Sequence, residues 1–410
     1  ILGDAQVQML FYHSAFAQEV AEVRAACPAI TLAVCIDDGM EAWMAPEGSH
    51  APEQPHDPQD LWTLYSTSGT TGRSKGAMLT QANLLSNAQT LADLWRFTSA
   101  DVLLHALPIF HTHGLFVASN VMLLCGGAMV FMPSFNPDTI LKHMPRTTSM
   151  MGVPTFYTRL LDHDGFTREA AAHMRLFISG SAPMLSETHE QFESLTGQRI
   201  LERYGMTETN MNTSNPYEGA RKAGTVGFAL PGVDVKICDP ESGATLPQGE
   251  IGVIEVRGPN VFKGYWKMPE KTREELREDG FFITGDLGQI DADGYVQIVG
   301  RGKDLIISGG YNIYPKEIEM VIDDQLGVKE SAVVGVPHPD LGESPVAVVV
   351  PDGAGPDIDQ ITSACATELA RFKHPRKIII LDALPRNTMG KVQKNALRED
   401  YKTLFTNTES

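Results

Sequence analysis

The stretch from Tyr65 to Gly76 reads YSTSGTTGRSKG. It combines hydroxyl side chains with three glycines and two cations. Glycine allows the backbone to approach a ligand closely, and successive N–H groups with nearby hydroxyls can surround an anion. The spacing differs from that of the usual P-loop. An apolar strand-like run (Leu61 to Tyr65) precedes the stretch and a helix-like run (Ala77 to Leu94) follows it. This setting favours a loop that binds nucleotide phosphates over a flexible Ser/Gly linker.

Length and charge limit the class of protein. The chain has 410 residues, more than one hydrophobic core usually serves, so two or more domains are expected. The hydrophobic fraction of 42% and the charged fraction of 20% are typical of a soluble globular protein. The formal net charge of -18 argues against nucleic acid or an anionic membrane as a partner. An anionic substrate must therefore be bound by local cations, against the overall field.

The cysteines and the start of the chain bear on the cellular compartment. Five scattered cysteines lack the spacing of a metal site and are expected to be buried free thiols (Cys27, Cys35, Cys125, Cys238 and Cys365). Free thiols are typical of a reducing compartment, which predicts a cytoplasmic protein. The chain begins at Ile1 rather than at a methionine, so organellar targeting stays open.

One uncharged segment, Gly114 to Phe135, is long enough to span a membrane. Polar residues, a Gly-Gly pair and a proline interrupt it. These interruptions favour a buried helix (Leu115 to Leu124), a turn and a strand (Ala128 to Met132).

The pattern of expected helices and strands changes twice along the chain. Short apolar runs alternate with helical stretches through about residue 230, as in an α/β domain with a largely parallel sheet. A β-rich subdomain is expected at about 231–300, and a compact α+β unit from about Asp304. The expected strands are Thr31–Ile36, Val102–Leu107, Ala128–Met132, Arg175–Ile178, Asp234–Ile237, Gly252–Gly258, Phe281–Thr284, Tyr295–Gly300, Ser331–Val336, Pro345–Val350 and Lys377–Leu381, with a helix around Asp359–Arg371.

A second motif, ERYGMTET, runs from Glu202 to Thr209. Its aromatic residue can stack on a base, its threonines can bond a phosphate, and its glutamate can hold Mg²⁺ directly or through water. The alternative is a helix N-terminus capped by Thr207.

A third pair of motifs, TGDL from Thr284 and GRGKD from Gly300, places an aspartate near an arginine. A carboxylate that accepts from two ribose hydroxyls is a common means of nucleoside recognition. The alternatives are a strand-end turn and a solvated charge cluster.

Two more motifs follow. SGGYN, from Ser308, carries paired glycines that permit close backbone approach or form a plain turn. PRNTMGK, from Pro385, ends in Lys391. A flexible amine there could neutralise charge that develops during phosphoryl-centre chemistry, whereas most lone lysines near a C-terminus are surface residues.

Taken in this order, the motifs resemble those of the adenylate-forming superfamily, which includes acyl-CoA synthetases, peptide-synthetase adenylation domains and firefly-type luciferases. The resemblance covers nearly the whole chain. It implies an α/β fold with a large domain over residues 1–302, containing mainly parallel sheets and the β-rich subdomain, and a small mobile α+β domain over residues 303–410. It also implies a further sheet-and-helix segment upstream of Ile1.

The resemblance assigns roles to individual residues. Tyr204 would stack on the base, Thr207 would contact the α-phosphate, and Glu208 would hold Mg²⁺. Asp286 would bind the ribose with help from Arg301, Lys391 would be catalytic with Thr207 and Glu208, and Lys303 would be the hinge. Gly309 and Gly310 would line the channel for the pantetheine arm of coenzyme A. The full set expected at ATP is Thr67, Ser68, Gly69, Thr70, Thr71, Gly72, Lys75, Tyr204, Gly205, Met206, Thr207, Asp286, Arg301 and Lys391.

The acid that is activated depends on the acyl pocket. Relatives that take bulky acids commonly have glycine where this chain has Arg203. A guanidinium there offers a bidentate grip on a carboxylate, and Ser181 and His113 could add donors. This combination resembles malonyl-CoA synthetases. The alternative is a structural salt bridge between Arg203 and Glu202 or another acid.

The sequence thus predicts an AMP-forming ligase that uses ATP, Mg²⁺ and coenzyme A to convert malonate to malonyl-CoA, AMP and pyrophosphate. The expected partners are small molecules, without nucleic acid or membrane, and the expected assembly is a monomer or homodimer. Three alternatives stay open: a synthetase for methylmalonate or another short acid, an adenylation enzyme that loads a carrier protein, and an inert binding protein of the same fold.

Overall fold

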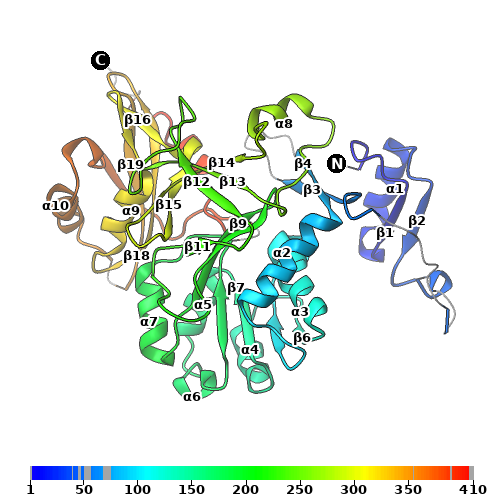
Figure 1. Ribbon diagram of the computed structural model, residues 1–410. Helices are drawn as coiled ribbons and strands as arrows, with labels where there is room; N and C mark the ends of the chain where they lie inside the picture. Colours follow the sequence, from blue (N-terminus) through cyan, green and yellow to red (C-terminus); the bar gives the residue numbers. More distant parts are fainter. Residues whose placement is uncertain are drawn as a thin grey trace.

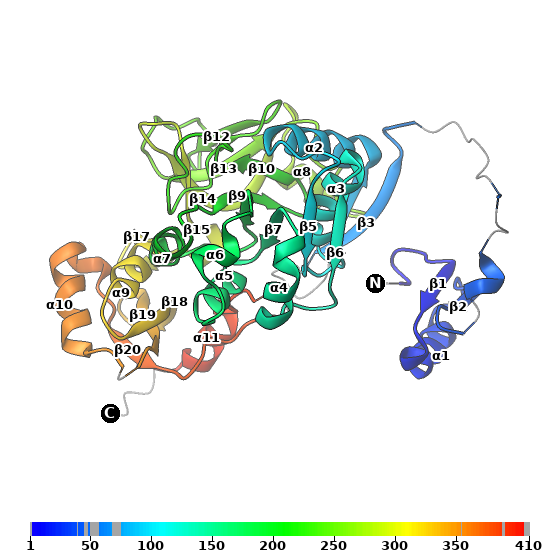
Figure 2. The same cartoon turned by 90° about the horizontal axis from the view of Figure 1, so that it is seen from below.

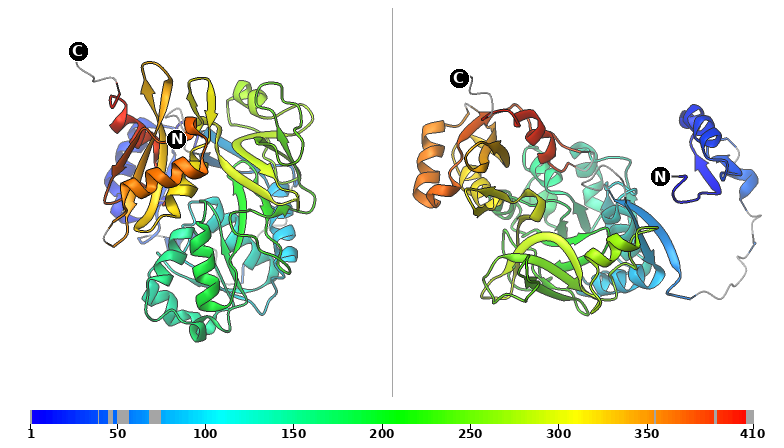
Figure 3. Two further views of the ribbon diagram at one scale, coloured as in Figure 1. Left: turned by 90° about the vertical axis from the view of Figure 1, so that its left-hand side faces the viewer. Right: turned by 90° about the horizontal axis from the view of Figure 1, so that it is seen from above.

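The computed structural model describes residues 2–38, 40–44, 48–49, 57–67, 75–353, 355–387 and 390–405. Figure 1 shows a central body, an N-terminal unit in blue and a C-terminal part in yellow to red. Figure 2 and the right-hand view of Figure 3 place the N-terminal unit and the C-terminal part at opposite ends of the body. The N-terminal unit contains two parallel strands and a helix: β1 (Met9–Tyr12), α1 (Ala17–Ala26) and β2 (Leu32–Cys35).

The body is built on a seven-stranded sheet of order β11-β10-β9-β8-β7-β5-β6. Its five strands from β6 to β9 are parallel, and β10 and β11 continue it in antiparallel fashion. Helices cover the sheet on both faces (Figure 1). The elements are β5 (Val102–His105), a π-helix (His113–Ser119), α3 (Asn120–Cys125), β6 (Ala128–Phe131), α4 (Pro137–His143), β7 (Ser149–Gly152), α5 (Pro154–Leu161), α6 (Arg168–Ala171), β8 (Leu176–Ser179), α7 (Ser186–Thr196), β9 (Leu201–Met206), β10 (Asn210–Ser214) and β11 (Phe228–Ala229).

The stretch after the glycine-rich loop is a strand before it is a helix. β3 (Leu61–Thr67) and β4 (Lys75–Thr80) form an antiparallel hairpin, and α2 covers Gln81–Leu94. The prediction of a helix from Ala77 is therefore wrong for its first four residues. Thr80 explains the boundary, because its hydroxyl accepts from the Asn83 N–H while the Asn83 side chain accepts from the Thr80 N–H. This capping box starts the helix at Gln81.

The predicted β-rich subdomain is a four-stranded antiparallel sheet. It consists of β12 (Asp234–Cys238), β13 (Gly252–Arg257), β14 (Phe282–Ile290) and β15 (Val296–Arg301), with α8 (Pro269–Glu275) between β13 and β14. Its inner residues, such as Ile254 and Val256, pack in one core with residues of β8 and β9. The subdomain is thus joined to the body through buried apolar surface.

The C-terminal part has a sheet of its own, with an apolar layer on each face. The sheet contains β16 (Ile306–Ser308), β17 (Tyr311–Ile313), β18 (Val328–His338), β19 (Gly342–Pro351) and β20 (Lys377–Ile380). Successive side chains of a strand point to opposite faces. Val333 accordingly packs with α9 (Pro315–Asp323) and α10 (Ile358–Glu368), and Val334 packs on the side of α11 (Lys394–Tyr401). This double burial explains the unbroken apolar run in β19.

The uncharged segment Gly114 to Phe135 forms the π-helix, α3 and β6, as expected, but it is buried only in part. Leu123 is 68% exposed and Leu124 is also exposed, because α3 lies at the edge of the sheet beside β6. Among the helices that the structure describes, none is both long and apolar enough to cross a membrane.

Candidate active site

Strand alternation separates the two charged residues at the centre of β9. Glu202 faces α7, where its Oε1 lies 3.3 Å from His189 Nδ1. Arg203 faces the other way and is only 2% exposed. No acid of the described chain pairs with Arg203, and its Nε and Nη2 have no hydrogen-bond partner there. Pairing of Arg203 with Glu202 is therefore wrong, no other acid among the described residues takes its place, and burial lowers the pKa of Arg203 to about 9.

Ser181 and His113 lie together. Ser181 Oγ is 3.2 Å from His113 Nδ1, although the residues are far apart in the sequence. Ser181 has a φ of 72°, a left-handed conformation that is strained for a residue with a side chain. Burial, with Arg203 as the next cause, lowers the pKa of His113 well below its usual value. His113 is thus a neutral imidazole close to a guanidinium that has no acid partner among the described residues.

His111, two residues earlier, belongs to the same cluster. Burial lowers its pKa to about 4, and the charges of Lys391 and Arg203 act in the same direction. Two cations and two neutral imidazoles therefore share one region. Such a set of donors is suited to bind an anion with more than one negative oxygen.

The predicted nucleoside residues are brought together by β9, β14 and β15. The Tyr204 hydroxyl donates to Asp286 Oδ2 at 2.6 Å, and Arg301 Nε lies 3.0 Å from Asp286 Oδ1. Asp286 and Arg301 are also direct neighbours in the β14–β15 register. The carboxylate of Asp286 is thus held in place from both sides.

Thr207 and Glu208 lie in the turn between β9 and β10, so the alternative of a helix N-terminus is wrong. Glu208 is only 5% exposed, and burial raises its pKa. Its Oε1 lies 3.0 Å from the Tyr265 hydroxyl, which is also 2.6 Å from Glu275 Oε2. One phenolic hydrogen cannot be donated to both carboxylates, so Glu208 is a buried carboxylate that can accept a cation.

Lys75, at the start of β4, completes this group. Its Nζ is 3.1 Å from the Tyr265 hydroxyl and 3.5 Å from Glu275 Oε2. Sequence reasoning missed Tyr265 and Glu275, because they lie in an aromatic run and in an acidic stretch without a motif of their own. The side chain of Thr67 and the whole of Ser68, Gly69, Thr70, Thr71 and Gly72 fall outside the described residues.

Lys391 reaches the same region from the C-terminal part. Its backbone N–H donates to Asn387 Oδ1 at 3.0 Å, and the preceding Gly390 has a φ of 74°. Burial and then the charge of Arg301 lower the pKa of Lys391 to about 8, and Asp286 opposes this decrease. Lys391 is thus close enough to the nucleoside residues for their charges to change its pKa.

The two other C-terminal predictions lie further out. Lys303 is in a short 3₁₀ turn (Gly302–Asp304) that links β15 to β16. Its neighbour Asp304 pairs with Arg398 of α11 at 2.9 Å. Gly309 and Gly310 form the exposed turn of the β16–β17 hairpin, and both have positive φ, which that turn requires. Their role toward coenzyme A stays a prediction.

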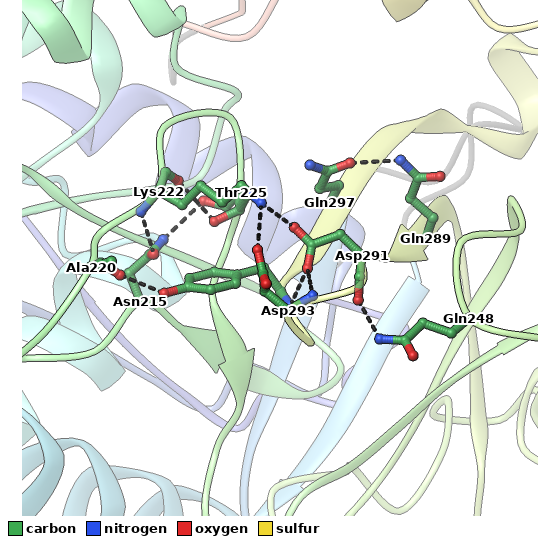
Figure 4. Close-up of polar contacts among 10 residues, drawn as sticks. Asn215, Ala220, Lys222, Thr225, Gln248, Gln289, Asp291, Asp293 and Gln297 are labelled. Carbon is green, nitrogen blue, oxygen red and sulfur yellow. Dashed lines mark hydrogen bonds and ion pairs between the residues drawn. The ribbon is translucent and has the colours of Figure 1, made fainter.

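A polar network joins the β10–β11 connection to the β14–β15 turn (Figure 4). Lys222 Nζ pairs with Asp291 at 2.6 Å and Asp293 at 3.3 Å, which joins the β10–β11 connection to the β14–β15 turn. In that connection, Asn215 donates to the carbonyl of Glu202 at 3.2 Å. The strand that carries Arg203 is thereby anchored to the β-rich subdomain.

Comparison with known proteins agrees with this geometry. The profile of the AMP-binding enzyme family matches residues 1–266, and that of the AMP-binding enzyme C-terminal domain matches residues 317–391. A malonate–CoA ligase from Arabidopsis thaliana is 38% identical over 368 residues, or 82% of this chain. The chain spans 60% of the length of that relative.

Three solved structures differ in how well they superpose. The crystal structure of ATP-bound MatB from Rhodopseudomonas palustris is 56% identical, covers 98% of this chain and 81% of its own, and has a TM-score of 0.94. The apo form of the same protein has a TM-score of 0.81 at the same identity and coverage. A malonyl-CoA ligase product complex with methylmalonyl-CoA and AMP, 42% identical over 82% of this chain and 74% of its own, gives 0.59.

The present arrangement of the two parts thus resembles the ATP-bound form, in agreement with the position of Lys391. The family profiles together cover most of the chain, and the mixed α/β architecture agrees with them. The chain belongs to the AMP-binding enzyme family.

Proposed function

We propose that this protein is an AMP-forming malonate–CoA ligase. In the first half-reaction, a malonate carboxylate oxygen attacks the α-phosphorus of ATP, and pyrophosphate leaves with the electrons of the broken P–O bond. In the second, the thiol of coenzyme A attacks the acyl carbon of malonyl-adenylate, AMP leaves, and the thiol proton is released. The product is malonyl-CoA. No protein nucleophile is needed, because the acyl-adenylate is already activated.

The observation that carries this proposal is the buried guanidinium of Arg203, which has no acid partner among the described residues. Malonate has one carboxylate to react and another that stays charged. Burial of that second charge unpaired would cost several kcal/mol, and the same holds for the guanidinium. A bidentate pair between them removes both costs at once. Ser181 and His113, next to each other, supply further polar groups.

Lys391 supports the first half-reaction. Charges on β9, β14 and β15 all influence its pKa, so its ammonium lies near both the acyl and the nucleoside residues. From there it can neutralise charge on the attacking carboxylate and on the α-phosphate. The second half-reaction would follow rotation of the C-terminal part about Lys303, which removes Lys391 and brings the Gly309–Gly310 turn toward the site.

Glu208 fits the Mg²⁺ that the family implies, since it is a buried carboxylate whose side-chain donor among the described residues, the Tyr265 hydroxyl, is shared with Glu275. Among the described residues, no cluster of three or more His, Cys, Asp or Glu side chains forms. Mg²⁺ is commonly held by one or two carboxylates together with substrate phosphates. When bound, Mg²⁺ would reduce the negative charge of the phosphates.

The direct test is pyrophosphate release by the 410-residue chain with ATP, Mg²⁺ and a panel of acids: acetate, butyrate, malonate, methylmalonate and succinate. We expect malonate to give the highest kcat/KM, with methylmalonate next and the monocarboxylic acids about 100-fold lower or more. Equal rates for butyrate and malonate would contradict the proposed substrate. Absence of release with every acid would favour an inert binding protein.

A second assay compares coenzyme A with a pantetheinylated carrier protein as acceptor, and preference for the carrier would favour the loading enzyme.

A further inference from the structure

Gly180 follows β8 directly and lies beside Arg203. β8 and β9 are parallel neighbours, with Ser179 paired to Glu202 in the register. A Cβ atom added to Gly180 would lie 2.5 Å from Arg203 Nη1, 2.6 Å from Cζ and 2.9 Å from Nε. These distances are about 1 Å shorter than an ordinary contact between non-bonded heavy atoms. The Arg203 guanidinium therefore lies in the space that any other residue at position 180 would fill.

Backbone conformation does not explain this glycine. Gly180 is absent from the glycines with positive φ, so an L-residue could adopt its backbone conformation. The next residue, Ser181, does have positive φ and is not a glycine. The requirement at position 180 is thus for space beside Arg203, not for a special turn.

We propose that Gly180 is a specificity-determining residue of the acyl site, because it leaves the space in which Arg203 can receive a second carboxylate. The inference rests on the function proposed above. An alanine at position 180 would displace the end of a long side chain, not a backbone segment, so the fold should survive. The displaced guanidinium would lose its alignment for a bidentate pair and would occupy part of the acyl space. Short dicarboxylic acids would lose binding, and monocarboxylic acids would gain none.

Activity with monocarboxylic acids distinguishes the roles of Gly180 and Arg203 experimentally. Arg203→Gly opens the pocket and removes a charge that monocarboxylic acids leave unpaired, so it should relatively favour butyrate. Gly180→Ala keeps the charge and reduces the space, so butyrate should stay poor. The two variants of the same contact thus differ in kcat/KM for butyrate itself, which Arg203→Gly should raise and Gly180→Ala should not.

The test is a double-mutant cycle of wild type, Gly180→Ala, Arg203→Gly and the double variant, measured by pyrophosphate release with malonate. We expect Gly180→Ala to lower kcat/KM about 100-fold in the presence of Arg203 and less than about 3-fold in the Arg203→Gly background. Gly165→Ala is the matched control, because the nearest atoms to its added Cβ would be those of the His163 ring and the Leu141 side chain, at 3.2 Å. Near-normal malonate kinetics in Gly180→Ala, or an equal loss in both backgrounds, would overturn the inference.

A substrate-free measurement distinguishes failure of this inference from failure of the proposed function. In thermal unfolding of the same four proteins, Gly180→Ala should lower the melting temperature by several degrees with Arg203 present and by at most about one degree in the Arg203→Gly background. If wild type does not use malonate, the proposed function fails, and the melting cycle alone decides whether Gly180 makes room for Arg203. Equal lowering of the melting temperature by Gly180→Ala in the two backgrounds would refute the inference that Gly180 makes room for Arg203.

Discussion

Glu255 and Arg203 are both charged residues buried at the centre of β-strands, and their surroundings differ. Glu255, on β13, is 1% exposed and is held by two cations. Arg277 donates to it from Nη2 at 2.6 Å and from Nε at 2.9 Å, and Lys236 lies 3.2 Å away. Arg203, on β9, is as deeply buried and meets no acid of the described chain.

A buried charge without a partner costs several kcal/mol, whereas a paired one costs much less. The protein thus satisfies the charge of Glu255 in the β-rich subdomain and leaves that of Arg203 without an acid among the described residues of the body. On the proposed function, the paired charge of Glu255 stabilises the fold and the charge of Arg203 binds the substrate.

Lys391→Ala should have the largest effect. It removes a cation that the C-terminal part brings to the acyl and nucleoside residues, so malonyl-adenylate formation should fall about 1,000-fold or more. Thioester formation from supplied malonyl-adenylate should be retained, because that step follows departure of Lys391. Both half-reactions are measured by rapid quench. Lys402→Ala, which removes an exposed lysine at the C-terminal end of α11, is the control and should leave both unchanged. Equal losses in the two half-reactions would show that Lys391 does not act in adenylation alone.

Arg203→Met should have the next largest effect: it should lower activity with malonate and raise the stability of the substrate-free protein. It keeps most of the side-chain volume but removes the unpaired charge. We expect kcat/KM for malonate to fall on the order of 100-fold, which corresponds to about 3 kcal/mol of charged hydrogen bonding. Stability in the absence of substrate should rise by about 1 kcal/mol, measured by urea unfolding. A variant that loses stability would mean that Arg203 has a structural partner.

Glu255→Gln should show the reverse pattern. It leaves Arg277 and Lys236 without a counter-charge in a partly buried setting. We expect a loss of about 2–4 kcal/mol in the free energy of unfolding and less than about a threefold change in malonate kcat/KM. The same urea titration and pyrophosphate assay measure both. If activity falls as far as in Arg203→Met, the two buried charges do not divide between fold and ligand as the structure indicates.

The pH dependence of adenylation should be the smallest effect. In the proposed mechanism the ammonium form of Lys391 is the active one, and its pKa is lowered to about 8. As pH rises through 8 the amine loses its proton, so kcat/KM for pyrophosphate release should fall, by about tenfold at about pH 9. Lys391→Arg keeps its charge over this range and should lose the dependence at whatever rate it retains. A wild-type profile that is flat from about pH 7 to 9 would exclude Lys391 as the titrating group.

The fold and the order of the motifs could be predicted from the sequence, because strand and helix periodicity and glycine-bearing loops are local signals. The contacts of the site could not. Tyr265 is 57 residues from Glu208, and only the packing of the β-rich subdomain brings its hydroxyl to that carboxylate. The helix predicted from Ala77 begins late because a capping pair at Thr80 outweighed the apolar pattern. Gly180 is visible in the sequence, but the reason for a glycine there is the guanidinium of Arg203 on the neighbouring strand, which the sequence does not show.

Alternation along β9 has a consequence for how such a protein can diverge. Glu202 and Arg203 are consecutive, and they face opposite sides of one sheet. A single inserted or deleted residue in this strand would exchange them, which would place a carboxylate in the acyl pocket and a guanidinium against His189. On the proposed function, substitutions at Arg203 or Gly180 would change the acid without altering the register of the strand. Changes in the length of β9 would be removed by selection, so descendants with new substrates should still align here without gaps.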